Sequence, residues 1–85
     1  MHYIKIYGMG CRRCDQLHQN VMEALELVDI QAAVIKVEDL IEIADAGVGV
    51  TPCLEIDGKI VSQGRLPTVA KVTDMLRQAA ERDDV

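Results

Sequence analysis

The spacing of hydrophobic and polar residues predicts alternating strands and helices in the first half of the chain. Residues 2–7 are β-branched or aromatic at most positions and stop at a glycine, which is typical of a strand. From about 12 to 27, apolar residues recur at helical spacing, which predicts an amphipathic helix. Residues 31–37 indicate a second strand, and 39–46 a short helix with Asp39 as its N-cap. The predicted inward positions are Cys14, Leu17, Val21, Ala24, Leu25 and Val28 in the first helix, and Leu40, Ile43 and Ala44 in the second.

The second half of the chain contains a hairpin and a terminal helix. Residues 53–56 and 59–62 have strand patterns and flank Asp57-Gly58, a dipeptide typical of a type I′ hairpin turn. Pro67 is expected to open the last helix. The charged residues 81–85 are expected to form a frayed C-terminal tail. The predicted inward face of the last helix consists of Val69, Val72, Met75, Leu76 and Ala79.

These elements give the order β-α-β-α-β-β-α and an α/β fold. A strand that reaches its neighbour through a helix lies parallel to it with a right-handed crossover, so strands 2–7 and 31–37 should be parallel. The hairpin adds an antiparallel edge, which completes a four-stranded mixed sheet with three helices. The chain has no repeat, low-complexity tract or linker, so residues 1–80 are expected to form a single domain.

Composition narrows the classes of function. The 85 residues carry nine basic and fourteen acidic side chains, a net charge of −5, and two aromatic residues, both Tyr. A nucleic-acid-binding protein needs a basic face and stacking rings, so that class is disfavoured. No apolar run approaches the roughly 18 residues that span a bilayer, and the strand pattern starts at the N-terminus without a secretory signal. We therefore expect a cytoplasmic protein that binds neither nucleic acid nor membrane.

Three cysteines supply the candidate chemistry. An odd number in a small chain without a secretory signal does not fit a structural disulfide framework. Cys11 and Cys14 form a Cys-Arg-Arg-Cys motif, whereas Cys53 lies far away in the sequence. A close CxxC pair in a reducing compartment is a redox pair, half of a soft-metal site, or two unrelated cysteines, and spacing alone does not choose among them.

The position of the pair bears on its reactivity. Cys11 is predicted at the start of the first helix, where unpaired backbone N–H groups and the positive end of the helix dipole favour a negative charge. Arg12 and Arg13 add two cations beside it. Cysteines in such places have pKa values of roughly 3.5–7.5 instead of about 8.5, and the thiolate is the form that attacks disulfides. Cys11 is therefore the predicted nucleophile, and Cys14, on the inward face, the predicted resolving thiol.

One resemblance favours metal binding. The stretch Met9-Gly10-Cys11-Arg12-Arg13-Cys14, between a short strand and an amphipathic helix, resembles the Met-x-Cys-x-x-Cys loop of heavy-metal-associated domains, which carry soft ions such as Cu(I). The likeness covers only the first part of the chain, because a helical pattern at 39–46 follows where those domains have a hairpin. A soft-metal carrier for Cu(I) or Zn²⁺, binding through Cys11 and Cys14, is therefore the alternative function.

A second resemblance extends over nearly the whole chain. A CxxC pair at a helix start, Val50-Thr51-Pro52 before a strand, an Asp-Gly hairpin, Gly64 and a terminal helix are together similar to the thioredoxin fold. The short length and the Thr-Pro-x-Leu-x-Ile-x-Gly-Lys-x-Val stretch that starts at Thr51 most resemble the small redox-active disulfide proteins of that superfamily.

This second resemblance implies a minimal thioredoxin fold and a thiol–disulfide oxidoreductase. The enzyme would exchange a Cys11–Cys14 dithiol or disulfide with protein or small disulfide substrates. Pro52 would be a cis-proline facing the pair, and the backbone of Thr51 would bind the extended substrate. The resemblance also implies a thioredoxin-reductase-like flavoprotein as electron donor, with no cofactor beyond the redox-active disulfide itself.

Other reactive side chains have simpler interpretations. Alternation along its strand turns Cys53 away from the face of Pro52, so a buried, unreactive thiol is favoured over a third ligand or a regulatory thiol. His18 is expected to be half-buried on the first helix and not a metal ligand. Met9 is expected to form an apolar flap beside the active thiol, with a soft metal ligand as the alternative.

The charged residues near the pair are also open to interpretation. Arg12 and Arg13 are expected to tune Cys11, with simple solvation as the alternative. Asp15 is a candidate cap for the first helix. The acidic residues Glu38, Asp39, Glu42 and Asp45 are expected on the exposed face and first turn of the short helix.

Overall fold

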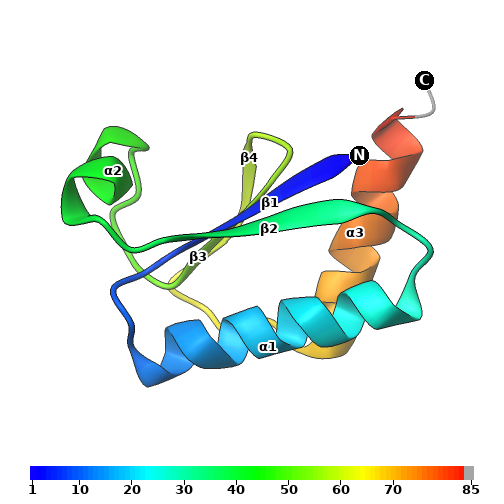
Figure 1. Cartoon of the computed structure of the whole chain (residues 1–85), viewed down its shortest axis with the longest axis horizontal. Coiled ribbons are helices and arrows are strands. Elements are labelled where there is room, and N and C mark those ends of the chain that lie inside the picture. The colour runs from blue at the N-terminus through cyan, green and yellow to red at the C-terminus, as the bar shows by residue number, and fades with distance from the viewer. Residues whose placement is uncertain (84–85) are drawn as a thin grey trace.

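In the computed structural model, which describes residues 1–83, the chain has the element order that the sequence predicts (Figure 1). None of the helices in this described part is long and apolar enough to cross a bilayer. The strands are β1 (His2–Tyr7), β2 (Ala32–Val37), β3 (Cys53–Ile56) and β4 (Lys59–Gln63), and the helices are α1 (Arg12–Leu27), α2 (Leu40–Asp45) and α3 (Val69–Asp83).

The four strands form one mixed sheet in the order β2-β1-β3-β4. β1 and β2 are parallel, and β3 is antiparallel to both β1 and β4. In the β3–β4 turn, Asp57 and Gly58 have φ angles of 51° and 84°, and a type I′ turn requires positive values at both central residues. The predicted α/β class and the minimal thioredoxin fold are therefore confirmed.

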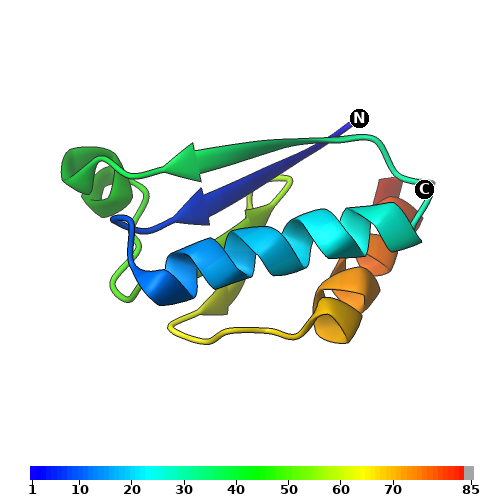
Figure 2. The ribbon, with the colours of Figure 1, turned by 60° about the horizontal axis from the view of Figure 1, so that its bottom comes forward.

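The main core lies between one face of the sheet and the two long helices. Figures 1 and 2 show α1 and α3 on the same side of the strands. The predicted helical stripes fill this space, and side chains at alternate positions of β1 and β3 complete it. Its buried members are Ile4, Ile6, Leu17, Val21, Ala24, Leu54, Ile56, Val72, Leu76 and Ala79, with Leu25, Val28, Val69 and Met75 partly buried against them.

A second, smaller core lies on the opposite face of the sheet, beneath α2. It consists of Tyr7, Val37, Ile43, Val48 and Cys53. The sequence prediction of the inward face of α2 is partly wrong, because Leu40 is 63% exposed and Ala44 is also exposed. The short helix meets the sheet near the ends of β1 and β2, at Tyr7 and Val37, and its one buried side chain, Ile43, fills the contact.

The last helix begins later than predicted. The backbone N–H of Lys71 donates to Thr68 Oγ1 at 3.2 Å, so Thr68 is the N-cap and Pro67 precedes the helix. α3 continues to Asp83, past the predicted domain boundary at 80. The remainder of the predicted tail, residues 84–85, lies outside the described residues.

Candidate active site

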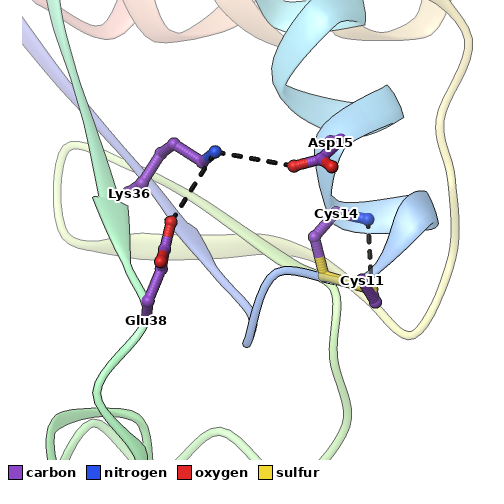
Figure 3. Close-up of polar contacts among 5 residues, drawn as sticks. All are labelled: Cys11, Cys14, Asp15, Lys36 and Glu38. Carbon is purple, nitrogen blue, oxygen red and sulfur yellow. Dashed lines mark hydrogen bonds and ion pairs between the residues drawn. A yellow bond between two sulfur atoms is a disulfide. The ribbon is translucent and has the colours of Figure 1, made fainter.

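Cys11 and Cys14 lie where the chain leaves β1 and enters α1. Cys11 is the N-cap of α1, with an extended backbone (φ −81°, ψ 161°). Its Sγ accepts a hydrogen bond from the backbone N–H of Cys14 at 3.2 Å. The two sulfurs form a disulfide across Cα atoms 5.1 Å apart (Figure 3). One of the N–H groups that the helix start leaves unpaired is therefore directed at the sulfur of Cys11.

The two cysteines differ in accessibility. Cys11 is exposed, whereas Cys14 is 2% exposed. Gly8 lies directly against Cys14, because a Cβ added to Gly8 would overlap Cys14 Sγ and stand 3.2 Å from Cys14 Cβ. An incoming disulfide therefore meets the sulfur of Cys11 first, while that of Cys14 stays covered.

The loop before β3 faces the pair. The Thr51–Pro52 peptide bond is cis, which confirms that expectation. Pro52 is buried and Thr51 is exposed. The Cβ position of Gly8 lies 3.9 Å from Thr51 Cβ as well as against Cys14 Sγ, so Gly8 separates the two segments. The structure thus brings together the four predicted site residues, which are Cys11, Cys14, Thr51 and Pro52.

Gly64, at the end of β4, ties these segments to each other. Its backbone N–H donates to the carbonyl of Pro52 at 2.8 Å, and its own carbonyl accepts from Arg13 Nη2 at 3.0 Å. Gly64 has a φ of +68°, and a Cβ there would stand 2.6 Å from Val50 Cγ1. Both the backbone angle and the contact therefore require glycine. In the sequence, Gly64 belongs to the thioredoxin-like pattern, but no local signal indicates this link between distant segments.

An ion-pair group borders the pair on the side of β2. Lys36 Nζ lies 3.6 Å from Asp15 Oδ1 and 3.6 Å from Glu38 Oε1 (Figure 3). Asp15 lies in the first turn of α1, yet the cap is Cys11, so the suggestion that Asp15 caps the helix is wrong. No local sequence signal marks Lys36, because only the parallel pairing of β1 and β2 brings it beside α1.

Exposed apolar side chains accompany the site on its solvent side. Met9, just before the CxxC motif, is 61% exposed, and Val50, just before Thr51, is 56% exposed. The exposure of Met9 is compatible with the predicted flap. Together they offer apolar contact area to a polypeptide that approaches Cys11.

Cys53 is a free thiol and is fully buried in the small core beneath α2. Burial, and after it the nearby charge of Glu55, raises the pKa of Cys53 to about 11. Tyr7 belongs to the same core and donates to Glu55 Oε1 at 3.1 Å. Burial and this hydrogen bond raise the pKa of Tyr7 to about 12. Cys53 is thus the buried thiol that the sequence predicts.

The alternative function, a soft-metal carrier, would be favoured by further metal ligands near Cys11 and Cys14. Among the side chains that the structure describes, those of residues 1–81, no group of three or more His, Cys, Asp or Glu is placed to hold a metal ion. His18 is half-buried on α1, as expected. His2 pairs through Nδ1 with Asp57 Oδ2, at the beginning of β1 and away from the cysteines.

Comparison with known proteins agrees with this geometry. A family described as thioredoxin domain matches residues 2–77. The chain is 40% identical to a thioredoxin of Methanocaldococcus jannaschii over 81 residues, which cover 95% of this chain and 93% of that protein. It is 33% identical to a thioredoxin of Methanothermobacter thermautotrophicus over 76 residues, which cover 89% of this chain and 99% of that protein.

Proposed function

This chain belongs to the thioredoxin domain family and is a thiol–disulfide oxidoreductase, and we propose that it reduces protein disulfides with Cys11 as the attacking thiol and Cys14 as the resolving thiol. The observation that carries this assignment of roles is the asymmetry of the two sulfurs. Cys11 is exposed, and its sulfur accepts a hydrogen bond from the backbone N–H of Cys14 at the helix start, whereas the sulfur of Cys14 is buried behind Gly8. A donor aimed at Cys11 Sγ favours its thiolate, and the thiolate is the attacking species.

The reaction follows from this arrangement. The Cys11 thiolate attacks one sulfur of the substrate disulfide, whose S–S bond breaks as a mixed disulfide forms and the other substrate sulfur leaves as a thiolate. Cys14 loses its proton and attacks Cys11 Sγ, which releases the second substrate thiolate. Two electrons have then passed to the substrate, whose thiolates take up protons from water, and the Cys11–Cys14 disulfide remains.

Thr51 supports binding of an extended substrate. The ladder between β1 and β3 ends at the pair Tyr7 and Cys53, so the backbone of Thr51 lies beyond its last rung. Thr51 is exposed and faces the pair across Gly8. A substrate strand that lies along Thr51 would therefore place its disulfide next to Cys11, with backbone hydrogen bonds that do not depend on its sequence.

A partner must return the electrons. We propose a thioredoxin-reductase-like flavoprotein as donor, and the cytoplasm as the compartment, because a reducing environment keeps the dithiol available. The redox-active disulfide serves as the electron carrier, with no separate cofactor. The test of the donor is NADPH oxidation by such a reductase, which should proceed only while oxidised protein is present and should stop after alkylation of the dithiol.

The assigned roles are tested by insulin reduction with dithiothreitol as the source of electrons. Cys11→Ser should lower the rate to that of dithiothreitol alone. Cys14→Ser, reduced beforehand and then freed of dithiothreitol, should attack insulin once and stop, so mass spectrometry should find a stable mixed disulfide between Cys11 and the substrate. Cys53→Ala is the matched control and should keep turnover, because that thiol is buried away from the pair.

Two results would overturn the assignment. Turnover by Cys11→Ser would show that another thiol attacks. A mixed disulfide on Cys14 in the Cys11→Ser protein, formed as fast as that on Cys11 in Cys14→Ser, would show that burial behind Gly8 does not set the order of attack.

A further inference from the structure

The segments around the disulfide differ in charge from the rest of the chain. Residues 8–14, 47–54 and 62–68 meet at the site, and they contain none of the fourteen acidic side chains. They contain three of the nine basic ones, namely Arg12, Arg13 and Arg65. A cationic surface therefore borders the reacting sulfur of a chain whose net charge is −5.

The fold gathers these three side chains, which we call the arginine rim. Arg13 reaches across to the carbonyl of Gly64, the residue before Arg65, at 3.0 Å. This contact holds the loop between β4 and α3 beside the first turn of α1 (Figure 2). Arg12 neighbours Cys11 and, by helical geometry, lies on the side of α1 opposite Cys14. All three arginines are exposed.

Carboxylates of the chain do not neutralise the arginine rim. Among residues 1–81, whose side chains the structure describes, no Asp or Glu forms an ion pair with any of its three members. Asp15 and Glu38 lie on the side of β2, where both face Lys36 (Figure 3). The surface around Cys11 is thus divided. Asp15, Glu38 and Lys36 lie toward β2, and the arginines, which have no carboxylate partner among these described side chains, lie toward β4.

The cationic side continues into a groove. Arg65 lines a groove of about 470 Å³ between β4 and the start of α3, together with Lys71. Leu66 and Met75 add apolar lining to the same groove. A polypeptide that passes Cys11 toward β4 would therefore meet one more cation, Lys71, and an apolar surface beyond the arginine rim.

We propose that the enzyme selects acidic polypeptides, in which Asp or Glu residues flank the disulfide and are held by the arginine rim. This inference rests on the proposed reduction of protein disulfides and names its substrate class. Exposed charges attract a partner of opposite sign before contact and raise the association rate, an effect that salt screens. Arg12 and Arg65 are the free members of the rim, since Arg13 also holds Gly64.

Three synthetic peptides test the proposal. Each has the same disulfide-closed loop, and the residues flanking the loop are acidic, neutral (Asn and Gln) or basic. We expect kcat/KM in the order acidic, neutral, basic, with the acidic peptide on the order of ten-fold above the basic one at low salt. At 0.5 M NaCl the three values should converge. Oxidised glutathione, a small anionic disulfide, is run beside them and should react more slowly than the acidic peptide.

Variants assign the preference to named residues. Arg12→Gln and Arg65→Gln should each lower the acidic-to-basic ratio by about two- to three-fold, and the double variant by the product of these factors. A change in the reactivity of Cys11 would alter kcat/KM for both peptides by the same factor, so it cancels in the ratio. Arg77→Gln is the matched control, because Arg77 is exposed on α3 and does not line the groove, and it should leave the ratio unchanged.

The outcomes separate this inference from the proposed function. Equal rates on all three peptides, or an equal fall in the ratio for Arg77→Gln, would overturn the selection of acidic partners while the reductase remained intact. Faster reduction of oxidised glutathione than of the acidic peptide would overturn the choice of a polypeptide. Failure of the wild-type protein to reduce any of these disulfides would instead overturn the proposed function.

Discussion

At Gly8 the chain needs space, and at Gly64 it needs both space and an unusual backbone angle. Gly8 leaves room for the sulfur of Cys14, and Gly64 at φ +68° leaves room for Val50 while it bonds to Pro52. Neither residue carries chemistry of its own. They allow the CxxC motif, the cis-proline loop and the end of β4 to approach each other closely.

The space at Gly8 can be tested with a matched pair of alanine substitutions. Gly8→Ala should lower the free energy of unfolding by about 1–3 kcal/mol, because its Cβ would overlap Cys14 Sγ in a packed site. Gly49→Ala should be neutral or slightly stabilising, because a Cβ there meets nothing within 4 Å. Urea unfolding of the oxidised proteins measures both. Equal losses would show that crowding at Cys14 is not the cause.

Cys53 should be inert in the folded protein. Burial and Glu55 raise its pKa to about 11, so at pH 8 the thiolate fraction is on the order of one in a thousand. Iodoacetamide should therefore modify the exposed Cys11 first in the reduced, folded protein, and Cys53 only after unfolding in guanidinium chloride. Mass spectrometry gives the number of modified thiols. Modification of Cys53 at the rate of Cys11 in the folded state would contradict this prediction.

At the scale of elements, a polar contact fastens the start of β1 to the β3–β4 turn. Asp57 accepts from His2 Nδ1 and, at 2.8 Å, from the backbone N–H of Tyr3. Partial burial works to raise the pKa of Asp57, but the hydrogen bonds from His2 and Tyr3 outweigh it, so the pKa is lowered below 3.8. The ionised carboxylate is therefore the form that holds the hairpin.

The pH dependence of stability follows from this direction. A carboxyl group whose pKa is lower in the folded state contributes stability above its unfolded pKa, and the contribution disappears as the pH falls through the folded value. The wild-type protein should therefore lose more stability between pH 5 and pH 3 than Asp57→Asn, which keeps a residue suited to positive φ. Urea midpoints across this range measure the difference. Parallel curves for the two proteins would show that Asp57 does not contribute.

The elements themselves could be predicted from the sequence because their signals are local. Each of these signals depends on a few neighbouring residues. Examples are the helical stripe through Leu17 and Val21, the alternation in β1 and the Asp57-Gly58 turn, and none of them requires knowledge of a distant contact. The cysteines and the cis Thr51–Pro52 bond could be predicted for another reason, since they belong to a motif shared by a family.

The features that the sequence did not predict depend on contacts between distant segments. The exposure of Leu40 follows from how little of α2 reaches the sheet. The link from Arg13 through Gly64 to Pro52 joins three segments that only the finished fold brings together. The cap of α3 has a local signal, the threonine after Pro67, but a proline at the first helical position is also a common pattern and predicts an earlier start.

At the scale of the whole molecule, the sheet separates two cores that should differ in what they stabilise. The large core joins α1, α3 and the strands, whereas the small one attaches α2 through a single buried helix residue, Ile43. The small core also contains Val48, in the loop that leads from α2 to Thr51 and Pro52. Detachment of α2 should therefore disturb the loop that carries Thr51 and Pro52 without unfolding the whole protein.

A pair of core truncations distinguishes global from local loss. Leu17→Ala, in the large core, should lower the global free energy of unfolding by about 2–5 kcal/mol. Ile43→Ala should cost clearly less in urea unfolding, because α2 can detach while the large core stays closed. Hydrogen exchange should show the difference directly, with faster exchange confined to residues 40–50 in Ile43→Ala, and insulin reduction should fall with it. If Ile43→Ala instead raised exchange equally in α1 and β1, the two cores would form one cooperative unit, and the cis-proline loop would be no easier to open than the rest of the sheet.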